Sequence, residues 1–393
     1  MENNLFDNTE IAFKSKSKMD LYRGYYIFKI ISKPIVVSIS KFFLTKFPFL
    51  LGGLTKWFVK SSIFKQFCGG ETEKDCIKTV ENLSSSNIYS ILDYSVEGLV
   101  DNYAFDNTVS RTLNLIDLNT DNNFPFIVFK PTAIGEFSLY EKVSKAESLS
   151  IDEELEWNKI IDRFEFICER ASLKNVSVLI DAEESWIQPS VDQIFENLII
   201  KYNSKRATVY NTVQAYRIDR LFYIKELKNK YFNTSVNIGI KLVRGAYMQK
   251  ERDRALDLKY TSPIHNSKNE TDKSFNDCMN YIFNNINLFS IFIGSHNEQS
   301  NTLAIKYMSN HKIPVNDGKV WFSQLYGMSD HISYNLSHLG YKVAKYLPFG
   351  PVKDVIPYLL RRADENKSVG GQTSRELSLF SKEINRRKNY SKV

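Results

Sequence analysis

Eight short apolar runs alternate with longer amphipathic stretches along most of this chain, and this alternation most constrains its fold. The runs are rich in Ile, Val, Phe and Tyr, as buried β-strands are. They are Tyr89–Val96, Phe126–Lys130, Val176–Asp181, Thr208–Val213, Ile238–Val243, Phe289–Ile293, Val320–Gln324 and Lys342–Leu347. Because parallel strands are joined by helical crossovers, the alternation predicts an α/β fold with a parallel sheet. Eight repeats favour a closed (βα)8 barrel.

The stretches between the runs have helical periodicity. They cover Ile151–Leu173, Val191–Lys205, Tyr216–Tyr231, Thr271–Leu288, Glu298–Asn310 and Ser329–Leu339. Ser150 and Glu153 predict a capping box at the start of the first stretch. A last helix is predicted over Pro351–Asn366, and residues 1–75 also have a helical pattern. We therefore expect two domains: an N-terminal helical segment, residues 1–75, and the barrel, residues 76–393.

An open doubly wound sheet is the alternative to a barrel. Such a sheet has a glycine-rich, phosphate-binding turn between its first strand and the following helix. The candidate glycine pairs, Gly69-Gly70 and Gly370-Gly371, do not join a strand to a helix. The barrel is therefore the favoured fold.

Composition and motifs argue against several classes of function. The net charge of +7 is diffuse and no recognition-helix pattern is present, so nucleic-acid binding is not expected. The four cysteines and five histidines lack the spacings of metal ligands, so no metal site is expected. The low cysteine count fits a reducing compartment. No nucleophile elbow, Ser-His-Asp pattern or phosphate-binding loop is present, which disfavours acyl and phosphoryl transfer.

Residues 30–59 are apolar and aromatic, but lysines, prolines and the Gly52-Gly53 pair interrupt them. A membrane-spanning helix needs about 20 consecutive apolar residues, and this segment has no such run. Two interpretations stay open: short helices packed on the main domain, which we favour, or an amphipathic patch on a membrane surface. The first 20 residues are polar and do not have the pattern of a signal peptide.

A polar or ionisable residue stands at the end of every predicted strand. Barrel enzymes place their active sites at the carboxyl ends of the strands, so we expect these side chains to line one rim. A rim with cations and counter-charges suits a small substrate that carries a carboxylate. Because the set offers no protein nucleophile, it points to chemistry by a bound cofactor. In chain order the residues are Glu97, Lys130, Asp181 with Glu183, Gln214, Lys241 with Arg244, Ser295-His296-Asn297, Gln324 and Tyr346.

Two segments add detail to this rim. In "YLLRRADEN", residues 358–366, Arg361 and Arg362 follow an apolar run. Neighbours on a helix are about 100° apart, so both guanidiniums can face one site and bind a carboxylate or phosphate. In "KLVRGAYMQKER", residues 241–252, a cation, two small residues and an aromatic ring follow a strand. That pattern fits either a planar, phosphate-bearing cofactor or an ordinary strand-to-loop turn.

These two segments, together with "LIDAEES", "TVQAY", "SHNE", "FSQLYGM" and "KYLPFGPVKDVIPYLLRRADEN", resemble the flavin-dependent proline dehydrogenases. The resemblance is to the form found in mitochondria and in single-domain bacterial enzymes, and it runs from about residue 88 to residue 380. It implies a distorted (βα)8 barrel that carries non-covalent FAD. It also implies oxidation of L-proline to 1-pyrroline-5-carboxylate, with electrons passed to a membrane quinone.

The resemblance implies roles for individual residues as well. The proline carboxylate would be bound by Lys130, Arg361 and Arg362. The counter-charges would be Asp181 and Glu97, and the substrate ring would lie against Tyr346 and Leu325. The isoalloxazine of FAD would lie near Gln214 and Lys241. Its phosphate and adenosine side would contact Arg244, Gly245, Ala246, Tyr247 and Met248, and further polar contacts would come from Thr271, Ser295, His296, Asn297 and Glu365. Many bacterial relatives have Arg in place of Lys241 and an aromatic residue in place of Met248.

Three alternatives remain beside proline oxidation. The first is oxidation of hydroxyproline, against which the bulk of Tyr346 argues. The second is another flavin barrel, such as a folate reductase, and the third is a binding protein without enzymatic activity. The resemblance further implies pyrroline-5-carboxylate dehydrogenase as a partner. It implies a cytoplasmic location, with peripheral contact to the inner membrane, or a mitochondrial one in a eukaryote.

Overall fold

The computed structural model describes residues 5–33, 59–94, 101–119, 124–368 and 372–390, and it gives only the backbone of residues 361–368 and 372. Eight parallel strands form one sheet in the order β1-β8-β7-β6-β5-β4-β3-β2, and helices connect them. The predicted α/β fold with a distorted (βα)8 barrel is confirmed. The strands are β1 (Ile88–Tyr94), β2 (Phe126–Phe129), β3 (Ser177–Ile180), β4 (Val209–Gln214), β5 (Ile238–Val243), β6 (Phe289–Gly294), β7 (Val320–Leu325) and β8 (Val343–Phe349).

Each predicted strand matches an observed one to within about two residues. The strands are buried almost throughout, which explains why they read as continuous apolar runs rather than as alternating patterns. Neighbouring strands are in parallel register, so that Thr212 of β4 lies opposite Lys241 of β5, and Lys241 lies opposite Phe292 of β6. This register fixes which strand-end side chains can meet.

Contacts divide the chain into two compact units. The terminal unit comprises residues 1–97 and 324–393, and the central unit comprises residues 98–323, so the division falls within β7. The domain boundary predicted after residue 75 stays a prediction. Besides β1 and β8, the terminal unit contains α1 (Thr9–Ala12), α2 (Lys18–Ile31), the π-helix η3 (Lys60–Phe64), α5 (Lys65–Phe67), α6 (Glu73–Ser84), α15 (Asp330–His338), α16 (Val352–Ser368) and α17 (Gln372–Tyr390).

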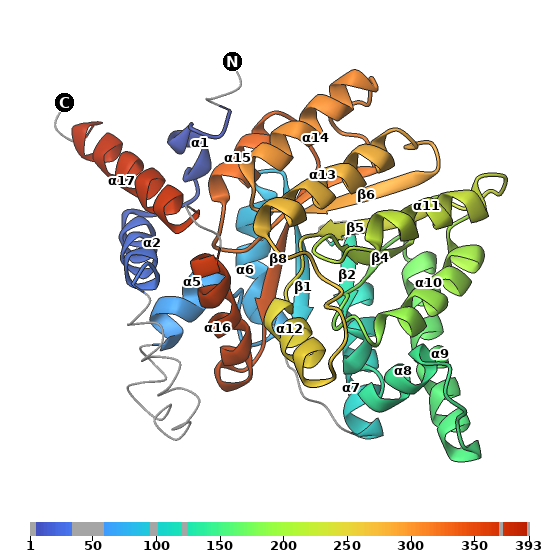
Figure 1. Ribbon diagram of the computed structural model, residues 1–393. Coiled ribbons are helices and arrows are strands. Elements are labelled where there is room, and N and C mark those ends of the chain that lie inside the picture. The colour runs from blue at the N-terminus through green and yellow to red at the C-terminus, as the bar shows by residue number, and fades with distance from the viewer. Residues whose placement is uncertain (1–4, 34–58, 95–100, 120–123, 369–371, 391–393) are drawn as a thin grey trace. The chain divides into compact units, whose positions relative to one another are not determined.

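The central unit holds β2 to β6 and the helices around them, among which α13 and α14 run alongside β6 (Figure 1). The predicted helix with the capping box is confirmed in full as α9, since Ser150 Oγ accepts the Glu153 N–H and Glu153 accepts the Ser150 N–H. The helices are α7 (Asn102–Asp117), the 3₁₀ turn η4 (Pro131–Ala133), α8 (Phe137–Ser144), α9 (Ile151–Leu173), α10 (Gln188–Tyr202), α11 (Arg220–Tyr231), α12 (Met248–Asp257), α13 (Lys268–Phe283) and α14 (Glu298–Asn310).

Two predicted helices are shorter in the structure than the sequence predicts. The helix predicted from Tyr216 begins at Arg220, because residues 215–218 instead bond to neighbouring loops. The Tyr216 N–H donates to the Arg244 carbonyl at 2.7 Å, and the Tyr216 carbonyl accepts the His265 N–H at 2.7 Å. The helix predicted to reach Leu288 ends at Phe283 and is followed by turns. Tertiary partners for the backbone thus delay the start of the first helix, and local turns follow the end of the second.

An aromatic layer fills the core of the central unit. The Phe126 ring, at the start of β2, meets Tyr210, Phe292 and Trp321 with ring centroids 5.6, 5.0 and 4.9 Å away. All three pairs are edge-to-face, the geometry that aromatic quadrupoles favour. The layer packs strands that are far apart in sequence.

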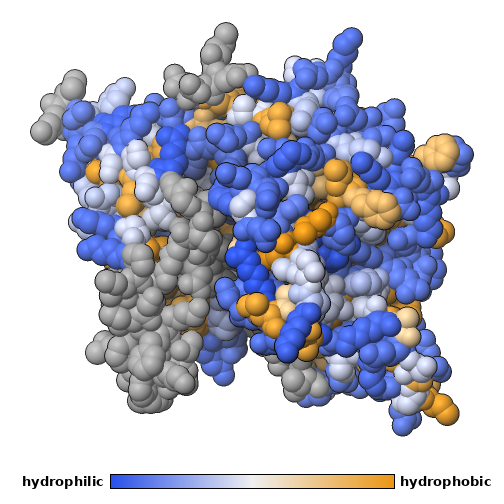
Figure 2. Space-filling model, in the orientation of Figure 1, coloured by the Kyte–Doolittle hydropathy of each residue, from blue (hydrophilic) through white to orange (hydrophobic). Residues whose placement is uncertain are grey.

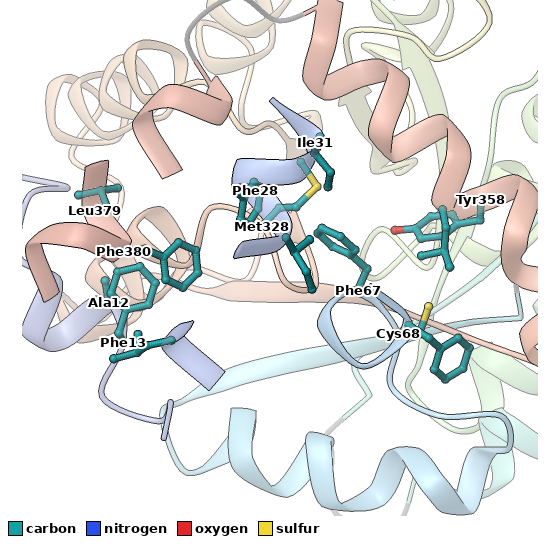
Figure 3. Close-up of a cluster of buried hydrophobic side chains, with 14 of the residues drawn as sticks. Ala12, Phe13, Phe28, Ile31, Phe67, Cys68, Met328, Tyr358, Leu379 and Phe380 are labelled. Atoms are coloured by element: carbon teal, nitrogen blue, oxygen red, sulfur yellow. The ribbon is translucent and has the colours of Figure 1, made fainter. Parts of the chain in front are cut away.

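The terminal unit has its own hydrophobic core, built from both ends of the chain (Figure 3). Phe380 of α17 lies 4.7 Å from Phe13 and 5.8 Å from Phe28, measured between ring centroids. Gly24 of α2 leaves room for the same ring, because a Cβ there would lie 2.5 Å from it. The N-terminal and C-terminal helices therefore depend on each other for burial.

The face shown in Figure 2 is mostly hydrophilic, with hydrophobic side chains in small groups. Among the described residues, no helix is both long and apolar enough to cross a membrane. Most of the apolar segment 30–59 lies outside the described residues.

Candidate functional site in the central unit

An ion pair joins two of the predicted strand-end residues. Lys241 of β5 forms a salt bridge with Asp181, which directly follows β3. Only 8% of the Lys241 side chain and 18% of the Asp181 side chain are exposed. The pair reaches across β4, and the Asp181 N–H is anchored on the Phe129 carbonyl at 3.0 Å. A buried pair of this kind holds both charges in place, because loss of one partner leaves the other uncompensated.

Glu183 and Gln214 together connect the ends of four neighbouring strands, β2 to β5. Its buried carboxylate accepts the N–H of Thr132 at 3.1 Å and the hydroxyl of Thr132 at 2.8 Å, which fixes the loop after β2. Its carbonyl accepts the Gln214 side-chain N–H at 2.7 Å, and the Gln214 Oε1 accepts the Ala246 N–H at 3.3 Å. The sequence marks Glu183 only as a neighbour of Asp181, because the role of Glu183 depends on partners that are distant in the chain.

The protonation of Glu183 is unusual. Burial raises the pKa of this carboxyl to about 7, although the positive charge of Lys130 and the two bonds from Thr132 act in the opposite direction. Lys130 is thus close enough to Glu183 to act on it electrostatically. A carboxyl that titrates near neutral pH beside a predicted substrate cation is a recognised sign of a functional site.

Arg244 is held by four contacts within the central unit. Its Nε donates to Asp272 at 2.6 Å, and its two terminal nitrogens donate to the hydroxyls of Ser295 at 2.8 Å and Ser300 at 3.0 Å. Its guanidinium also lies 4.4 Å from the centre of the Phe275 ring. Burial lowers the pKa of Arg244 despite the carboxylate of Asp272. The guanidinium therefore ties β5 to β6, α13 and α14.

The segment after β5 turns sharply at Gly245. Its φ is +127°, and a Cβ at this position would lie 2.5 Å from the Tyr216 ring. The missing side chain at Gly245 therefore lets an aromatic ring of the chain itself pack against this turn. Ala246 is exposed and Tyr247 is half-buried, and the exposed Met248 begins α12 where the sequence suggested a loop.

The polar residues after β6 serve the neighbouring helix. Asn297 caps α14, since its Oδ1 accepts the Ser300 N–H at 2.9 Å. The buried Ser295 hydroxyl accepts the Asn297 N–H at 3.2 Å, besides its contact with Arg244. His296 is half-buried, and Thr271 is buried with its hydroxyl donating to the Ser267 carbonyl. Whether these four residues also touch a cofactor stays a prediction.

Helix α12 is attached to the segment that follows β3 by hydrogen bonds and an ion pair. The sequence did not predict this attachment. The fully buried carboxylate of Glu251 accepts both the N–H and the hydroxyl of Ser185, each at 2.6 Å. Lys250 pairs with Glu184 at 2.7 Å, and Arg254 lies 4.3 Å from the centre of the Trp186 ring. The alternating charges of "QKERDR" were the available signal, but nothing in the sequence names their partners.

The remaining predicted site residues belong to the terminal unit. Tyr346 on β8 is buried, and its carbonyl accepts the Tyr326 N–H at 2.8 Å; Leu325 ends β7 and is half-buried. The predicted C-terminal helix is confirmed as α16, whose backbone includes Arg361, Arg362 and Glu365. The side chains of these three residues, and Glu97 as a whole, lie outside what the structure describes. The carboxylate clamp therefore stays a prediction.

Comparison with known proteins gives one family. A family model described as proline dehydrogenase matches residues 76–375. The carbapenem antibiotics biosynthesis protein CarD of Pectobacterium carotovorum subsp. carotovorum is 34% identical over 322 residues, which cover 82% of this chain and 83% of that protein. The mitochondrial proline dehydrogenase 1 of Dictyostelium discoideum is 31% identical over 438 residues, which cover 98% of this chain and 76% of that protein.

The fold has a counterpart among solved structures. The crystal structure of proline utilization A from Bdellovibrio bacteriovorus, inactivated by N-propargylglycine, superposes with a TM-score of 0.72. The match covers 94% of this chain and 42% of that chain, at 19% sequence identity. At this identity the likeness supports the barrel fold alone.

Proposed function

Because this chain belongs to the proline dehydrogenase family, we propose that it catalyses the FAD-dependent oxidation of L-proline to 1-pyrroline-5-carboxylate, the first step of proline degradation. The family match over residues 76–375 carries the proposal, since this range includes every candidate site residue. The ion pair of Lys241 with Asp181 and the network around Glu183 lie within the same range.

The donor set of the central unit fits a flavin. Lys241 and Gln214 are buried, hydrogen-bonding side chains on adjacent strands, and they suit the polar edge of a flavin ring. The backbone turn at Gly245 and the exposed Ala246 suit a close approach by a large planar group. Bound FAD would supply the hydride acceptor that the protein side chains lack. Arg244, which directly precedes Gly245, is held in place by its bonds to Asp272 and Ser295.

For the substrate we propose that Lys130, Arg361 and Arg362 bind the proline carboxylate through charge-assisted hydrogen bonds. We propose that Asp181, which also pairs with Lys241, and Glu97 balance these cations, and that Tyr346 and Leu325 enclose the ring. A cationic site disfavours the protonated form of the proline amine, and hydride loss needs the neutral amine. The rate of flavin reduction is therefore expected to rise with pH as the bound amine loses its proton.

The wider context of the reaction is part of the same proposal. The electrons pass to a membrane quinone, so the chain works at a membrane surface, in the cytoplasm of a bacterium or in a mitochondrion. The product, 1-pyrroline-5-carboxylate, is consumed by a pyrroline-5-carboxylate dehydrogenase. Liposome co-sedimentation with and without residues 1–70 tests the membrane contact.

The test of the central proposal is flavin reduction by substrate. The purified protein should be yellow, and its flavin absorbance should bleach when L-proline is added without oxygen. Stopped-flow rates should be higher with L-proline than with trans-4-hydroxy-L-proline, and methylenetetrahydrofolate should not compete. A colourless protein that binds no FAD, or a flavin that proline does not reduce, would overturn the proposal.

The carboxylate clamp is tested separately with Arg361→Ala and Arg362→Ala. Each variant loses a charge-assisted hydrogen bond worth about 1.5–3 kcal/mol, so the KM for proline should rise at least about tenfold. The matched control is Lys353→Ala, which removes an exposed cation from the same helix and should leave KM unchanged. Unaltered KM in both arginine variants would reject the clamp.

A further inference from the structure

The loop segment Leu325–Ser329, which starts at the last residue of β7 and ends at the residue before α15, contains two residues with positive φ. Gly327 has a φ of +78°, and a Cβ there would lie 2.0 Å from the Gln66 carbonyl oxygen. Ser329 has a φ of +51°, the left-handed region that residues other than glycine rarely adopt. Such residues cost about 1–3 kcal/mol each and persist only where the surroundings enforce them, often beside functional sites. This loop follows the carboxyl end of a barrel strand and carries Leu325, the predicted cover of the substrate ring.

Lys345 of β8 donates hydrogen bonds to the backbone of this loop. Its ammonium donates to the carbonyls of Leu325 at 3.3 Å and Met328 at 2.5 Å, and it forms a salt bridge with Asp330 at 2.8 Å. The Lys345 side chain is fully buried. Asp330 also pairs with Lys16 at 3.0 Å, so that two lysines share one carboxylate.

Two further buried side chains hold the same loop. Gln66 of α5 donates its side-chain N–H to the Gly327 carbonyl at 2.9 Å. Glu376 of α17 accepts the Ser329 N–H at 2.6 Å. Side chains of three elements from separate parts of the sequence thus bond to four backbone positions within Leu325–Ser329.

Burying the charges of Lys345, Asp330 and Glu376 costs free energy, so packing alone does not explain why these residues stand here. Burial lowers the pKa of Lys345 even though Asp330 acts to raise it, and burial raises the pKa of Glu376. Ion pairs of this kind can often be replaced by apolar residues without loss of stability. What an apolar residue cannot replace is the pair of hydrogen bonds from Lys345 to two carbonyls of one strained loop.

We propose that Lys345 is a positioning residue that fixes the β7–α15 loop, and with it Leu325, as a rigid wall of the proline site that excludes a ring substituent. The inference rests on the proposed function. Neighbouring residues of a strand point to opposite faces, so β8 presents Lys345 to the loop backbone and Tyr346 to the other face. A loop that is already ordered contacts the proline ring without losing conformational entropy on binding. The same rigid loop clashes with the hydroxyl group of trans-4-hydroxy-L-proline.

The test compares Lys345→Met, which keeps the length of the side chain but loses the ammonium, with wild type on two substrates. We expect the KM for L-proline to rise at least threefold. The preference in kcat/KM for L-proline over trans-4-hydroxy-L-proline should fall at least threefold, because the wall can now yield. The matched control is Lys382→Met in the same unit, whose exposed ammonium donates to the Asp7 carbonyl; it should change neither quantity.

A second variant tests the same loop independently, in case the Lys345→Met protein does not fold. Gln66→Leu removes the bond to Gly327 without leaving a buried charge unpaired, and it should shift KM and substrate preference in the same direction. A residue with only a structural role would lower the melting temperature and the flavin content but leave both substrate quantities unchanged. That result in a folded, flavin-loaded variant would overturn the inference. Wild-type protein that does not oxidise proline would instead overturn the proposed function on which it rests.

Discussion

At the scale of single residues, the sharpest backbone requirement in the central unit lies at Gly245. Its positive φ and its contact with the Tyr216 ring together exclude a side chain. The glycine was visible in the sequence as part of "KLVRGAY", but the reason for it was not. Only the tertiary structure brings Tyr216, from the end of β4, against this turn.

Gly245→Ala should therefore destabilise the protein by at least about 1–3 kcal/mol, because the added methyl group meets the ring and the backbone is strained. The melting temperature by differential scanning fluorimetry measures the effect. The control is Gly318→Ala, where a Cβ would have no atom within 4 Å. Equal melting temperatures for the two variants would contradict this explanation.

Glu183 gives a pH-dependent prediction at the same scale. Its pKa is about 7 in the folded protein against 4.5 for an ordinary glutamate, so the folded state holds the proton more tightly. Its contribution to stability is complete below about pH 4.5 and is lost as the pH rises through about 7. Glu183→Gln does not titrate, so its free energy of unfolding relative to wild type should rise between pH 5 and pH 8, by at most about 3 kcal/mol. Its melting temperature relative to wild type should rise over the same range.

The comparison needs a carboxyl that lies on the surface. Glu154→Gln on α9 removes an exposed glutamate and should alter the melting temperature little at any pH. If the Glu183→Gln and wild-type curves run parallel from pH 5 to pH 8, the folded pKa of Glu183 is not raised.

At the scale of elements, contacts from helix α12 hold the segment after β3 in place. The two bonds from Ser185 to Glu251 and the ion pair of Lys250 with Glu184 join α12, which follows β5, to the segment that follows β3. The amphipathic pattern predicted most of the longer helices, since those bury one apolar face on the sheet. Helix α12 was missed because its bonds are polar and its partners are distant in sequence.

Glu251→Ala should weaken the attachment of α12 to the segment after β3. It leaves the half-buried N–H and hydroxyl of Ser185 without their acceptor, at a cost of up to about 1–3 kcal/mol for each group. Hydrogen exchange of the amides in Met248–Asp257 should become at least tenfold faster. Gln249→Ala serves as the control, since Gln249 bonds only to the nearby Asp253 on the exposed face of the same helix. Unchanged exchange in Glu251→Ala would mean that other contacts hold α12.

At the scale of the whole molecule, the chain closes on itself within the terminal unit. Helices α2 and α17, from opposite ends of the sequence, share one hydrophobic core around Phe380 (Figure 3). Polar contacts repeat the same closure, since Arg387 donates to the carbonyls of Phe13 and Lys16. The C-terminal helix is therefore an integral part of the fold.

Phe380→Ala should cost about 3–5 kcal/mol, the range for removing a large buried ring. Chemical denaturation followed by tryptophan fluorescence measures the loss. Tyr390→Ala, on the exposed end of the same helix, should cost less than about 0.5 kcal/mol. If both variants unfold at the wild-type denaturant concentration, α17 does not complete this core.

The sequence by itself determined the eight strands, most of the connecting helices and the family, because buried parallel strands and amphipathic helices leave local patterns and the family motifs are contiguous. It also marked Lys130, Asp181, Gln214, Lys241 and Arg244 as strand-end residues. Only the tertiary structure decided that Asp181 pairs with Lys241, that Glu183 and Gln214 together link four strand ends, and that Lys345 supports the loop after β7. Those partners are separated by tens of residues, and strand register and burial, which no local pattern encodes, bring them within hydrogen-bonding distance.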